Sequence, residues 1–410
     1  MEYAEQLVKA GHAYYAFDTA EELEIQRKEK PNFLYGQATR MSMRNSLTLA
    51  EEEVKKLLDE GTPYVIRINI PSEETVVFTD MIRGEVRFET NLVDDKVLLK
   101  ADGMPTYHLA VVVDDHAMEI SHAFRGEEWL PSAPIHILLW KYLGWQEEMP
   151  QWAHLPLILK PDGNGKLSKR DGDRLGFPVY AMNWMDPKTG ILTKGFREMG
   201  FLPEAFVNML AMLGWNDGTD RELFSLQELC DAFSIERISK AGAKFDFEKA
   251  KWYNHEWILR TPSVKLLEQV SVSLHNEGIE SNEELLLKVI DLVKERCNTI
   301  DDFLKQSAFF FVSPKEYDLL AVKGKWDSTK TNFFNTFSGK IQPAANSAEL
   351  ELLFKQLAEE MQIKPGELML PLRIMLVGGK FGPGVFDIAA LIGTDIIKER
   401  INTFIGAIEN

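Results

Sequence analysis

The spacing of apolar and polar residues changes along the chain and divides it into two parts. In about the first 160 residues, runs such as 64–70, 75–78 and 86–88 alternate between apolar and polar, which predicts β-strands. Short helical patterns lie between these runs. The first part is therefore predicted to be α/β.

Helical periodicity dominates the second part of the chain. One helix is predicted over residues 203–213, with proline in its first turn and Gly214 after its end. A second is expected to begin at 261–263 and to end near Gly278, and a third to follow residues 281–284. The second part is predicted to be an assembly of helices.

Two polar stretches are predicted to lack regular structure. Residues 160–165, Lys-Pro-Asp-Gly-Asn-Gly, have the composition of a turn. Residues 322–342 are expected to form a less ordered connection or a solvated loop, because they are polar and rich in lysine. The lysines of this stretch are Lys323, Lys325, Lys330 and Lys340.

The composition is that of a globular protein of two to four domains, since the 410 residues are 45% hydrophobic and 27% charged. Cys230 and Cys297 stand far apart and outside any CxxC or Cys/His spacing, which argues against disulfides and against zinc. No run of about 18 apolar residues occurs, and residues 1–11 are charged and amphipathic, unlike a signal peptide. We therefore expect a cytoplasmic protein with no membrane partner.

A net charge of -17 argues against non-specific binding to nucleic acid, which needs a basic surface. An acidic protein can still present a local basic strip to one partner. The net charge alone therefore does not decide whether the protein binds a nucleic acid.

The strongest local signal is the pentapeptide Lys166, Leu167, Ser168, Lys169 and Arg170, directly after the glycine-rich turn. Two lysines three residues apart on a loop can approach a polyphosphate and stabilise a leaving pyrophosphate. The alternative is a solvated basic loop, because residues 160–174 hold five basic and three acidic residues.

A second group of polar residues lies at 102–110, 114–116 and 125–130. Tyr107, His108 and Arg125 could be polar residues of the core. The triplet Asp-Asp-His at 114–116 could suggest a metal site, but adjacent side chains point in different directions and rarely bind one ion. No metal site is predicted there.

These motifs resemble those of one enzyme family. The stretch 154–160, His-Leu-Pro-Leu-Ile-Leu-Lys, with the following Lys-Leu-Ser-Lys-Arg, resembles the second signature of class I aminoacyl-tRNA synthetases in its glutamyl form. Residues 102–130 resemble the second half of their nucleotide-binding fold. Residues 370–384 resemble the anticodon-binding end of bacterial-type glutamyl-tRNA synthetases, and weaker similarities occur at 13–17, 80–84 and 251–254.

The resemblance implies roles for particular residues. Residues 166–170 would form the catalytic ATP loop, with Lys169 and Glu128 binding ATP. The glutamate pocket would contain Tyr107, Arg125, Trp129 and the position of Val111, where the family usually has asparagine. A guanidinium can hold a carboxylate in a forked geometry that discriminates against a neutral amide. The alternative for Arg125 is an ion pair with Glu128 on one helix face.

The resemblance also places tRNA contacts. Arg373, in the Pro-Leu-Arg stretch, would read an anticodon base by hydrogen bonds and stacking. Alternatively, its side chain simply reaches solvent from an apolar helix.

The implied architecture is α/β: a partial class I Rossmann-like fold with an inserted domain, followed by all-helical domains. Residues 1–12 would be a remnant of the first Rossmann half, 13–98 the inserted acceptor-binding domain and 99–149 the second Rossmann half. Residues 150–260 would contact the tRNA stem, and 261–410 would bind the anticodon.

The family implies a glutamate–tRNA ligase that uses ATP with Mg²⁺, glutamate and glutamate tRNA. Its first signature, His-Ile-Gly-His, is absent from the 410 residues, so they are expected to be inactive in glutamate activation, with the missing part encoded upstream. One alternative is a non-catalytic tRNA-binding protein derived from a synthetase. Another is a glutaminyl-tRNA synthetase, although that family ends in β-barrels, whereas residues 263–410 are predicted to be helical.

Overall fold

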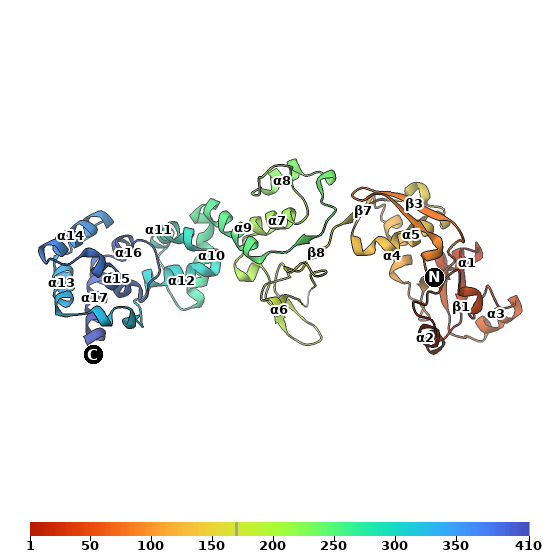
Figure 1. The fold of residues 1–410 in the computed structure, drawn as a ribbon, viewed down its shortest axis with the longest axis horizontal. Coiled ribbons are helices and arrows are strands. Elements are labelled where there is room, and N and C mark those ends of the chain that lie inside the picture. The colour runs from red at the N-terminus through yellow and green to blue at the C-terminus, as the bar shows by residue number, and fades with distance from the viewer. Residues whose placement is uncertain (169–170, 410) are drawn as a thin grey trace. The chain divides into compact units, whose positions relative to one another are not determined.

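A computed structural model describes residues 1–168 and 171–409 of the chain (Figure 1). It contains two compact units, each assembled from three segments. Unit 1 comprises Met1–Leu167, Met212–Arg221 and Asp231–Phe245. Unit 2 comprises the described residues of Ser168–Ala211, Glu222–Cys230 and Asp246–Asn410. The chain therefore passes repeatedly from one unit to the other.

Unit 1 begins with a small antiparallel sheet of order β1-β2-β5. Its strands are β1 (Ala13–Ala16), β2 (Val65–Ile68) and β5 (Val97–Leu99), and helices α1 (Glu2–Lys9), α2 (Ala20–Glu29) and α3 (Glu51–Asp59) precede or follow them. Ile66 and Ile68 on β2 are fully buried, as the alternation of residues 64–70 predicts.

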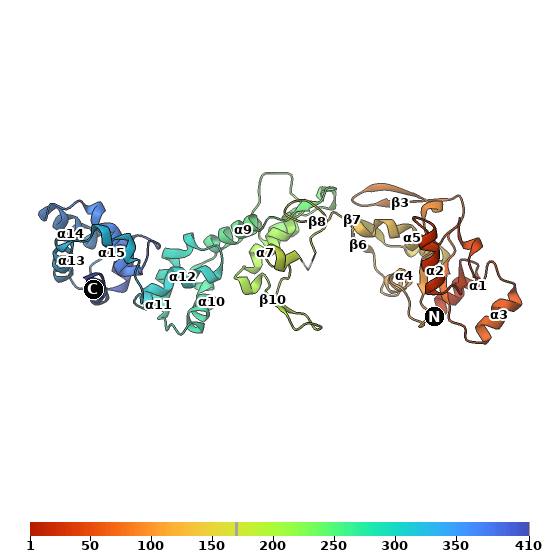
Figure 2. The same cartoon turned by 60° about the horizontal axis from the view of Figure 1, so that its bottom comes forward.

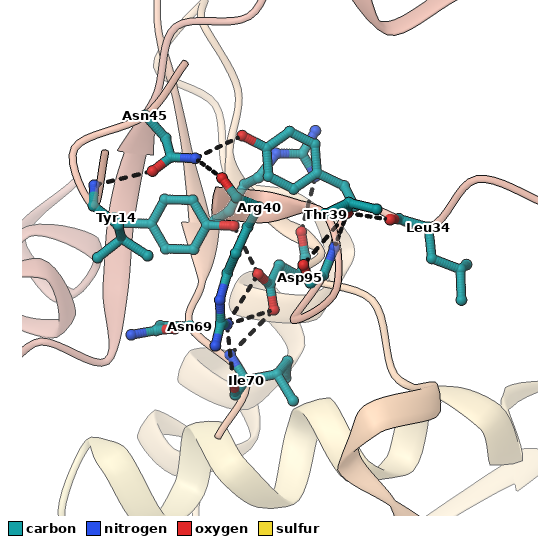
Figure 3. A network of polar contacts seen from close by, with 12 residues as sticks. Tyr14, Leu34, Thr39, Arg40, Asn45, Asn69, Ile70 and Asp95 are labelled. Carbon is teal, nitrogen blue, oxygen red and sulfur yellow. Dashed lines mark hydrogen bonds and ion pairs between the residues drawn. The ribbon is translucent and has the colours of Figure 1, made fainter. Parts of the chain in front are cut away.

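A buried carboxylate connects the segments around this sheet (Figure 3). Asp95 is fully buried and accepts hydrogen bonds from the Tyr14 hydroxyl (2.7 Å), from Arg40 Nη1 (3.2 Å) and from the Ile70 N–H (3.2 Å). Burial raises the pKa of Asp95, although these partners oppose the shift. Without such partners, a buried carboxyl group would strongly destabilise the fold. The network therefore holds three separate segments of unit 1 around one side chain.

The second sheet of unit 1 has the order β4-β3-β7-β6. Its strands are β3 (Thr75–Asp80), β4 (Gly84–Glu89), β6 (His122–Gly126) and β7 (Gln151–Leu155), flanked by α4 (Tyr107–Ala117) and α5 (Ala133–Tyr142). Strands β6 and β7 are parallel, and α5 provides the crossover between them (Figure 2). The strands predicted at 75–78 and 86–88 are thus confirmed as β3 and β4.

Unit 2 is largely helical, as predicted. Its described α-helices and strands are α6 (Asp171–Leu175), β9 (Trp184–Met185), β10 (Leu192–Thr193), α7 (Pro203–Met212), α8 (Leu226–Ala232), α9 (Phe247–Arg260), α10 (Ser263–Asn276), α11 (Glu283–Val293), α12 (Ile300–Phe311), α13 (Ser328–Lys340), α14 (Ser347–Glu360), α15 (Pro365–Val377), α16 (Val385–Ile392) and α17 (Thr394–Glu409). The last residues of α7 and α8 belong to unit 1. The three helices expected from the sequence correspond to α7, α10 and α11. The helices from α10 through α17 share one hydrophobic core.

The prediction of an irregular connection over residues 322–342 is wrong. Residues 328–340 form α13, which begins after Asp327, whose side chain accepts from the Lys330 N–H (3.0 Å). Phe333, Phe334 and Phe337 are buried on its inner face. These three aromatic residues decide the structure, because their burial stabilises the helix. Lys330, in the first turn of the helix, is itself buried and pairs with Asp327.

The turn expected over residues 160–165 is confirmed. Strand β8 (Ile158–Leu159) precedes it and pairs in parallel with β11 (Ala243–Lys244) in unit 1. Gly163 and Gly165 have φ of 78° and 87°, which favours glycine at both positions. The proposed division into five domains stays a prediction, and β3 and β4, assigned there to the inserted domain, share a sheet with β7.

No helix within residues 1–168 and 171–409 is long and apolar enough to cross a membrane.

Candidate active site

The candidate site lies in unit 1 at the carboxyl ends of β6 and β7. Open sheets with parallel strands bind ligands at this edge. Arg125 is near the end of β6, and the 3-10 helix η3 (Glu127–Ser132) follows directly. The parallel register sets Arg125 opposite His154 on β7. Strand pairing therefore brings the residues at 125–130 next to the stretch that begins at His154.

The Arg125 side chain is held on several sides and is only 8% exposed. Its Nη2 donates to Asp115 Oδ2 (3.2 Å) and its Nη1 donates to His136 Nδ1 (2.7 Å). The guanidinium carbon lies 4.7 Å from the centre of the Trp152 ring. The alternative ion pair between Arg125 and Glu128 is wrong, because both side chains contact other residues.

Two histidines continue the contacts of Arg125. His136 on α5 is fully buried, and its Nε2 lies 3.1 Å from His108 Nδ1. Burial, followed by the charge of Arg125, lowers the pKa of His136 to about 2. Burial also lowers the pKa of His108. Both rings are therefore neutral near pH 7.

Exposed aromatic residues stand beside the guanidinium. Tyr107, the first residue of α4, is 42% exposed, and its ring centre lies 4.5 Å from that of Trp129 on η3. The Arg125 guanidinium lies 5.9 Å from the Tyr107 ring. Val111, one turn further along α4, packs against the hydrophobic core of unit 1. Its position offers no polar group to a ligand.

The glycine-rich turn ends beside an acidic residue. Lys166 Nζ contacts the Glu128 carboxylate, and their side chains are 55% and 33% exposed. Burial raises the pKa of Glu128, but the hydrogen bond from Lys166, a backbone hydrogen bond and the charge of Lys166 together outweigh it, so the pKa lies below its ordinary value. A cation that is already paired with a carboxylate here can exchange that partner for a phosphate oxygen.

The rest of the pentapeptide is only partly described. The Leu167 N–H donates to the Ile158 carbonyl (2.8 Å), which closes the turn in unit 1. In unit 2, Ser168 donates to Asp171 Oδ2 through both its N–H (2.9 Å) and its hydroxyl (2.6 Å). Lys169 and Arg170 lie outside the described residues.

A third group of contacts has no local signal in the sequence. His154 Nδ1 lies 2.6 Å from Asp80 Oδ2, and both side chains are buried. Arg83 donates to the His154 carbonyl (3.1 Å) and to Glu127 Oε2 (2.6 Å). The stretch 80–84 stood out only by resemblance, because nothing in its spacing points to β7 or to η3.

The remaining polar residues of α4 have other partners. Asp115 binds Arg125, whereas His116 Nε2 contacts Glu148 (2.8 Å) and its ring stacks on Trp145 (3.8 Å). The described residues contain no group of three histidine, cysteine, aspartate or glutamate side chains that could hold a metal ion.

Arg373 lies on α15 in unit 2. Its Nη1 is within hydrogen-bond distance of the carbonyls of Phe381 (3.1 Å), Gly382 (3.2 Å) and Pro383 (2.7 Å). Burial, followed by the charge of Arg296, lowers its pKa. Arg373 therefore holds the glycine-rich loop before α16 and does not simply extend into solvent.

Comparisons with known proteins agree with these motifs. Residues 1–252 match the family of class I tRNA synthetases (E and Q), catalytic domain, and residues 258–405 match an anticodon-binding domain. The chain is 48% identical to a glutamate–tRNA ligase of Porphyromonas gingivalis, covering 97% of this chain and 79% of that protein. It is 47% identical to one of Flavobacterium johnsoniae, covering 99% and 81%.

Solved structures give the same result. A glutamate–tRNA ligase of Elizabethkingia meningosepticum, in complex with its amino acid, has a TM-score of 0.91 at 43% identity, covering 100% of this chain and 82% of that one. The enzyme of Elizabethkingia anophelis has a TM-score of 0.89, with the same identity and coverage. The chain belongs to the glutamate–tRNA ligase family of class I, ATP-using tRNA synthetases.

Proposed function

We propose that this chain contributes to the attachment of glutamate to glutamate tRNA, and that Arg125 recognises the side-chain carboxylate of glutamate. The observation that carries the proposal is the oriented guanidinium of Arg125 at the end of β6, which donates one N–H to Asp115 and one to His136. Three N–H groups remain for a ligand. A carboxylate can accept from two of them, whereas the amide nitrogen of glutamine cannot accept.

Tyr107 and Trp129 would form the walls of the same pocket. Their exposed rings lie close together beside Arg125 and can cover the methylene groups of an amino acid. Val111 would contribute only apolar contact. The lost amide contact would leave recognition of the side chain to Arg125 and Tyr107.

Glu128 and the lysine loop would bind ATP with Mg²⁺. In the first step, an oxygen of the α-carboxylate of glutamate attacks the α-phosphorus of ATP and pyrophosphate leaves, which gives glutamyl-adenylate. In the second step, the terminal ribose hydroxyl of tRNA attacks the acyl carbon of the adenylate and AMP leaves. Lys166 and Lys169 would stabilise charge on the departing phosphates. The contact between Lys166 and Glu128 supports this, because it holds a half-exposed cation beside η3 with an exchangeable anionic partner.

Arg373 would contribute to anticodon recognition through the loop that it holds.

The two cysteines support a cytoplasmic location for a protein with this function. Cys230 and Cys297 are both free, and proteins of a reducing compartment keep their thiols reduced.

Two measurements test the proposal. Binding of L-glutamate to the 410-residue chain should be lost in Arg125→Leu, while His122→Gln, an exposed change on the same strand, should leave it intact. Equal binding by wild type and Arg125→Leu would refute the assignment of Arg125.

The second measurement concerns activation. The 410 residues contain no His-x-Gly-His sequence, so we propose that by themselves they do not catalyse glutamate-dependent exchange of pyrophosphate into ATP. Much of the rate of such a transfer comes from groups that position the phosphates. Rapid exchange by the purified 410-residue protein would contradict this part of the proposal.

A further inference from the structure

The contacts among Arg125, His136 and His108 have a direction that follows from their chemistry. Arginine can only donate hydrogen bonds. His136 Nδ1, 2.7 Å from Arg125 Nη1, must therefore be an acceptor without a proton. A neutral imidazole then carries its proton on Nε2.

The same reasoning extends to the next ring. His136 Nε2 lies 3.1 Å from His108 Nδ1 and donates to it. His108 Nδ1 is then an acceptor as well, so the proton of neutral His108 is also on Nε2. The hydrogen bonds run in one direction, from the guanidinium through His136 to His108.

His136 has no room to adopt another arrangement. It is fully buried on α5, and its ring is nearly parallel to that of Trp152, with centres 6.2 Å apart and planes at 18°. Trp152 also lies under the guanidinium at 4.7 Å. Asp115 holds the other amino group of Arg125 from α4. Rotation of the guanidinium would break the bond to His136, the bond to Asp115, or both.

We propose that His136 is a positioning residue that fixes the orientation of the Arg125 guanidinium and sets His108 in its Nε2–H tautomer. His136 touches no substrate in this assignment and acts through Arg125. The consequence for glutamate rests on the proposed function: His136 and Asp115 each take one N–H of Arg125 and fix the direction in which its remaining donors point, and a guanidinium has no acceptor. A glutamine amide group, which also donates, finds no acceptor on it.

Nuclear magnetic resonance of the 410-residue chain tests the tautomers without any ligand. The eight histidines are labelled with ¹⁵N, and the signals of His136 and His108 are identified from His136→Gln and His108→Gln. We expect the Nε2–H tautomer for both rings near pH 7. A proton on Nδ1 of His136, or a positively charged His136 ring near pH 7, would overturn the proposal.

The positioning role has its own readout. Labelled Arg125 should show slow rotation of its guanidinium in the wild type and faster rotation in His136→Leu, which removes the acceptor. His136→Gln retains an acceptor oxygen and should restore slow rotation, and it also serves if the leucine variant does not fold. Rotation as fast in the wild type as in free arginine, or equally slow in His136→Leu, would overturn the proposal.

Titration with L-glutamate and L-glutamine separates this inference from the proposed function. If Arg125 recognises the carboxylate, His136→Leu should lower the preference for glutamate by about tenfold, the effect of a single misplaced interaction. His122→Gln should not change it. A wild-type chain that shows the expected tautomers and slow rotation but no response to glutamate would refute the proposed function and support the positioning of Arg125.

Discussion

Arg83 Nη2 lies 2.6 Å from Glu127 Oε2, so the turn between β3 and β4 is bonded to the start of η3. The same guanidinium donates to the carbonyls of His154 (3.1 Å) and Lys240 (2.6 Å). Glu127 also accepts from the Leu157 N–H (3.2 Å). One pair of side chains thus connects four segments of unit 1 around the candidate site.

Removing Arg83 should destabilise unit 1. Arg83→Ala removes the donor to two backbone carbonyls and to Glu127 Oε2, so we expect a loss of about 2–3 kcal/mol in the free energy of unfolding. Urea unfolding measures it. Arg87→Ala is a matched control, because Arg87 is 64% exposed and pairs with nearby Glu85; its change should be within about 0.5 kcal/mol. Equal losses in both variants would contradict the role of Arg83.

Unit 1 should lose stability in acid because of His136. Its pKa falls from the ordinary value of 6.5 to about 2 on folding, mainly through burial. Between these values the unfolded chain binds a proton that the folded chain does not, so stability falls as the pH falls below 6.5. The slope from this residue is at most about 1.4 kcal/mol per pH unit.

Urea unfolding at several pH values between about 7.5 and about 5 measures this slope, because the range includes the unfolded-state pKa of histidine near 6.5. His136→Gln should flatten it, whereas substitution of exposed His275 should not. A slope that does not change in His136→Gln would show that His136 is already protonated in the folded protein.

Lys169 should affect the rate and not the affinity for glutamate. In a chain extended by the first-signature segment of a relative, Lys169→Ala should lower the rate of adenylate formation by roughly 100-fold or more, because the cation acts on charge that develops at the phosphates. Pre-steady-state kinetics measures the rate, with Lys188→Ala as an exposed control. Loss of glutamate binding at an unchanged rate would give Lys169 a different role.

Arg373 should matter for the anticodon. Arg373→Ala should weaken binding of glutamate tRNA by about 1–3 kcal/mol and affect a tRNA with an exchanged anticodon much less. Fluorescence titration with both tRNAs measures the difference, and binding should fall as salt rises. Lys364→Ala, an exposed change at the start of the same helix, is the control, and circular dichroism checks the fold because Arg373 holds the loop at 381–383. Equal losses with both tRNAs would make Arg373 a general phosphate contact or a packing residue.

Much of the secondary structure follows from local sequence. Strands β2, β3 and β4 alternate along their length, and α7, α10 and α11 have clear boundaries in proline, asparagine or glycine. The lysines at 323–340 favour a loop, whereas α13 depends on three phenylalanines whose burial requires partners elsewhere in the chain, such as Phe354. Tertiary packing decided that segment.

The site was predicted only in part for a similar reason. Tyr107, Arg125 and Trp129 were expected together from resemblance, and the structure brings them together. His136 had no distinguishing signal, since it is one polar residue within the apolar run of α5. Its importance comes from its distance to Arg125, which is set by the crossover between β6 and β7 and not by any local pattern.

The repeated passage of the chain between the two units has a consequence for fragments. A cut between Leu167 and Ser168 would leave unit 1 on two separate polypeptides, with β8 on the first and β11 on the second. These strands are paired, with the Ala243 N–H bonded to the Leu157 carbonyl and the Phe245 N–H to the Leu159 carbonyl, both at 3.0 Å. The two polypeptides are therefore complementary halves of a split protein, and neither contains a complete unit 1 without the other.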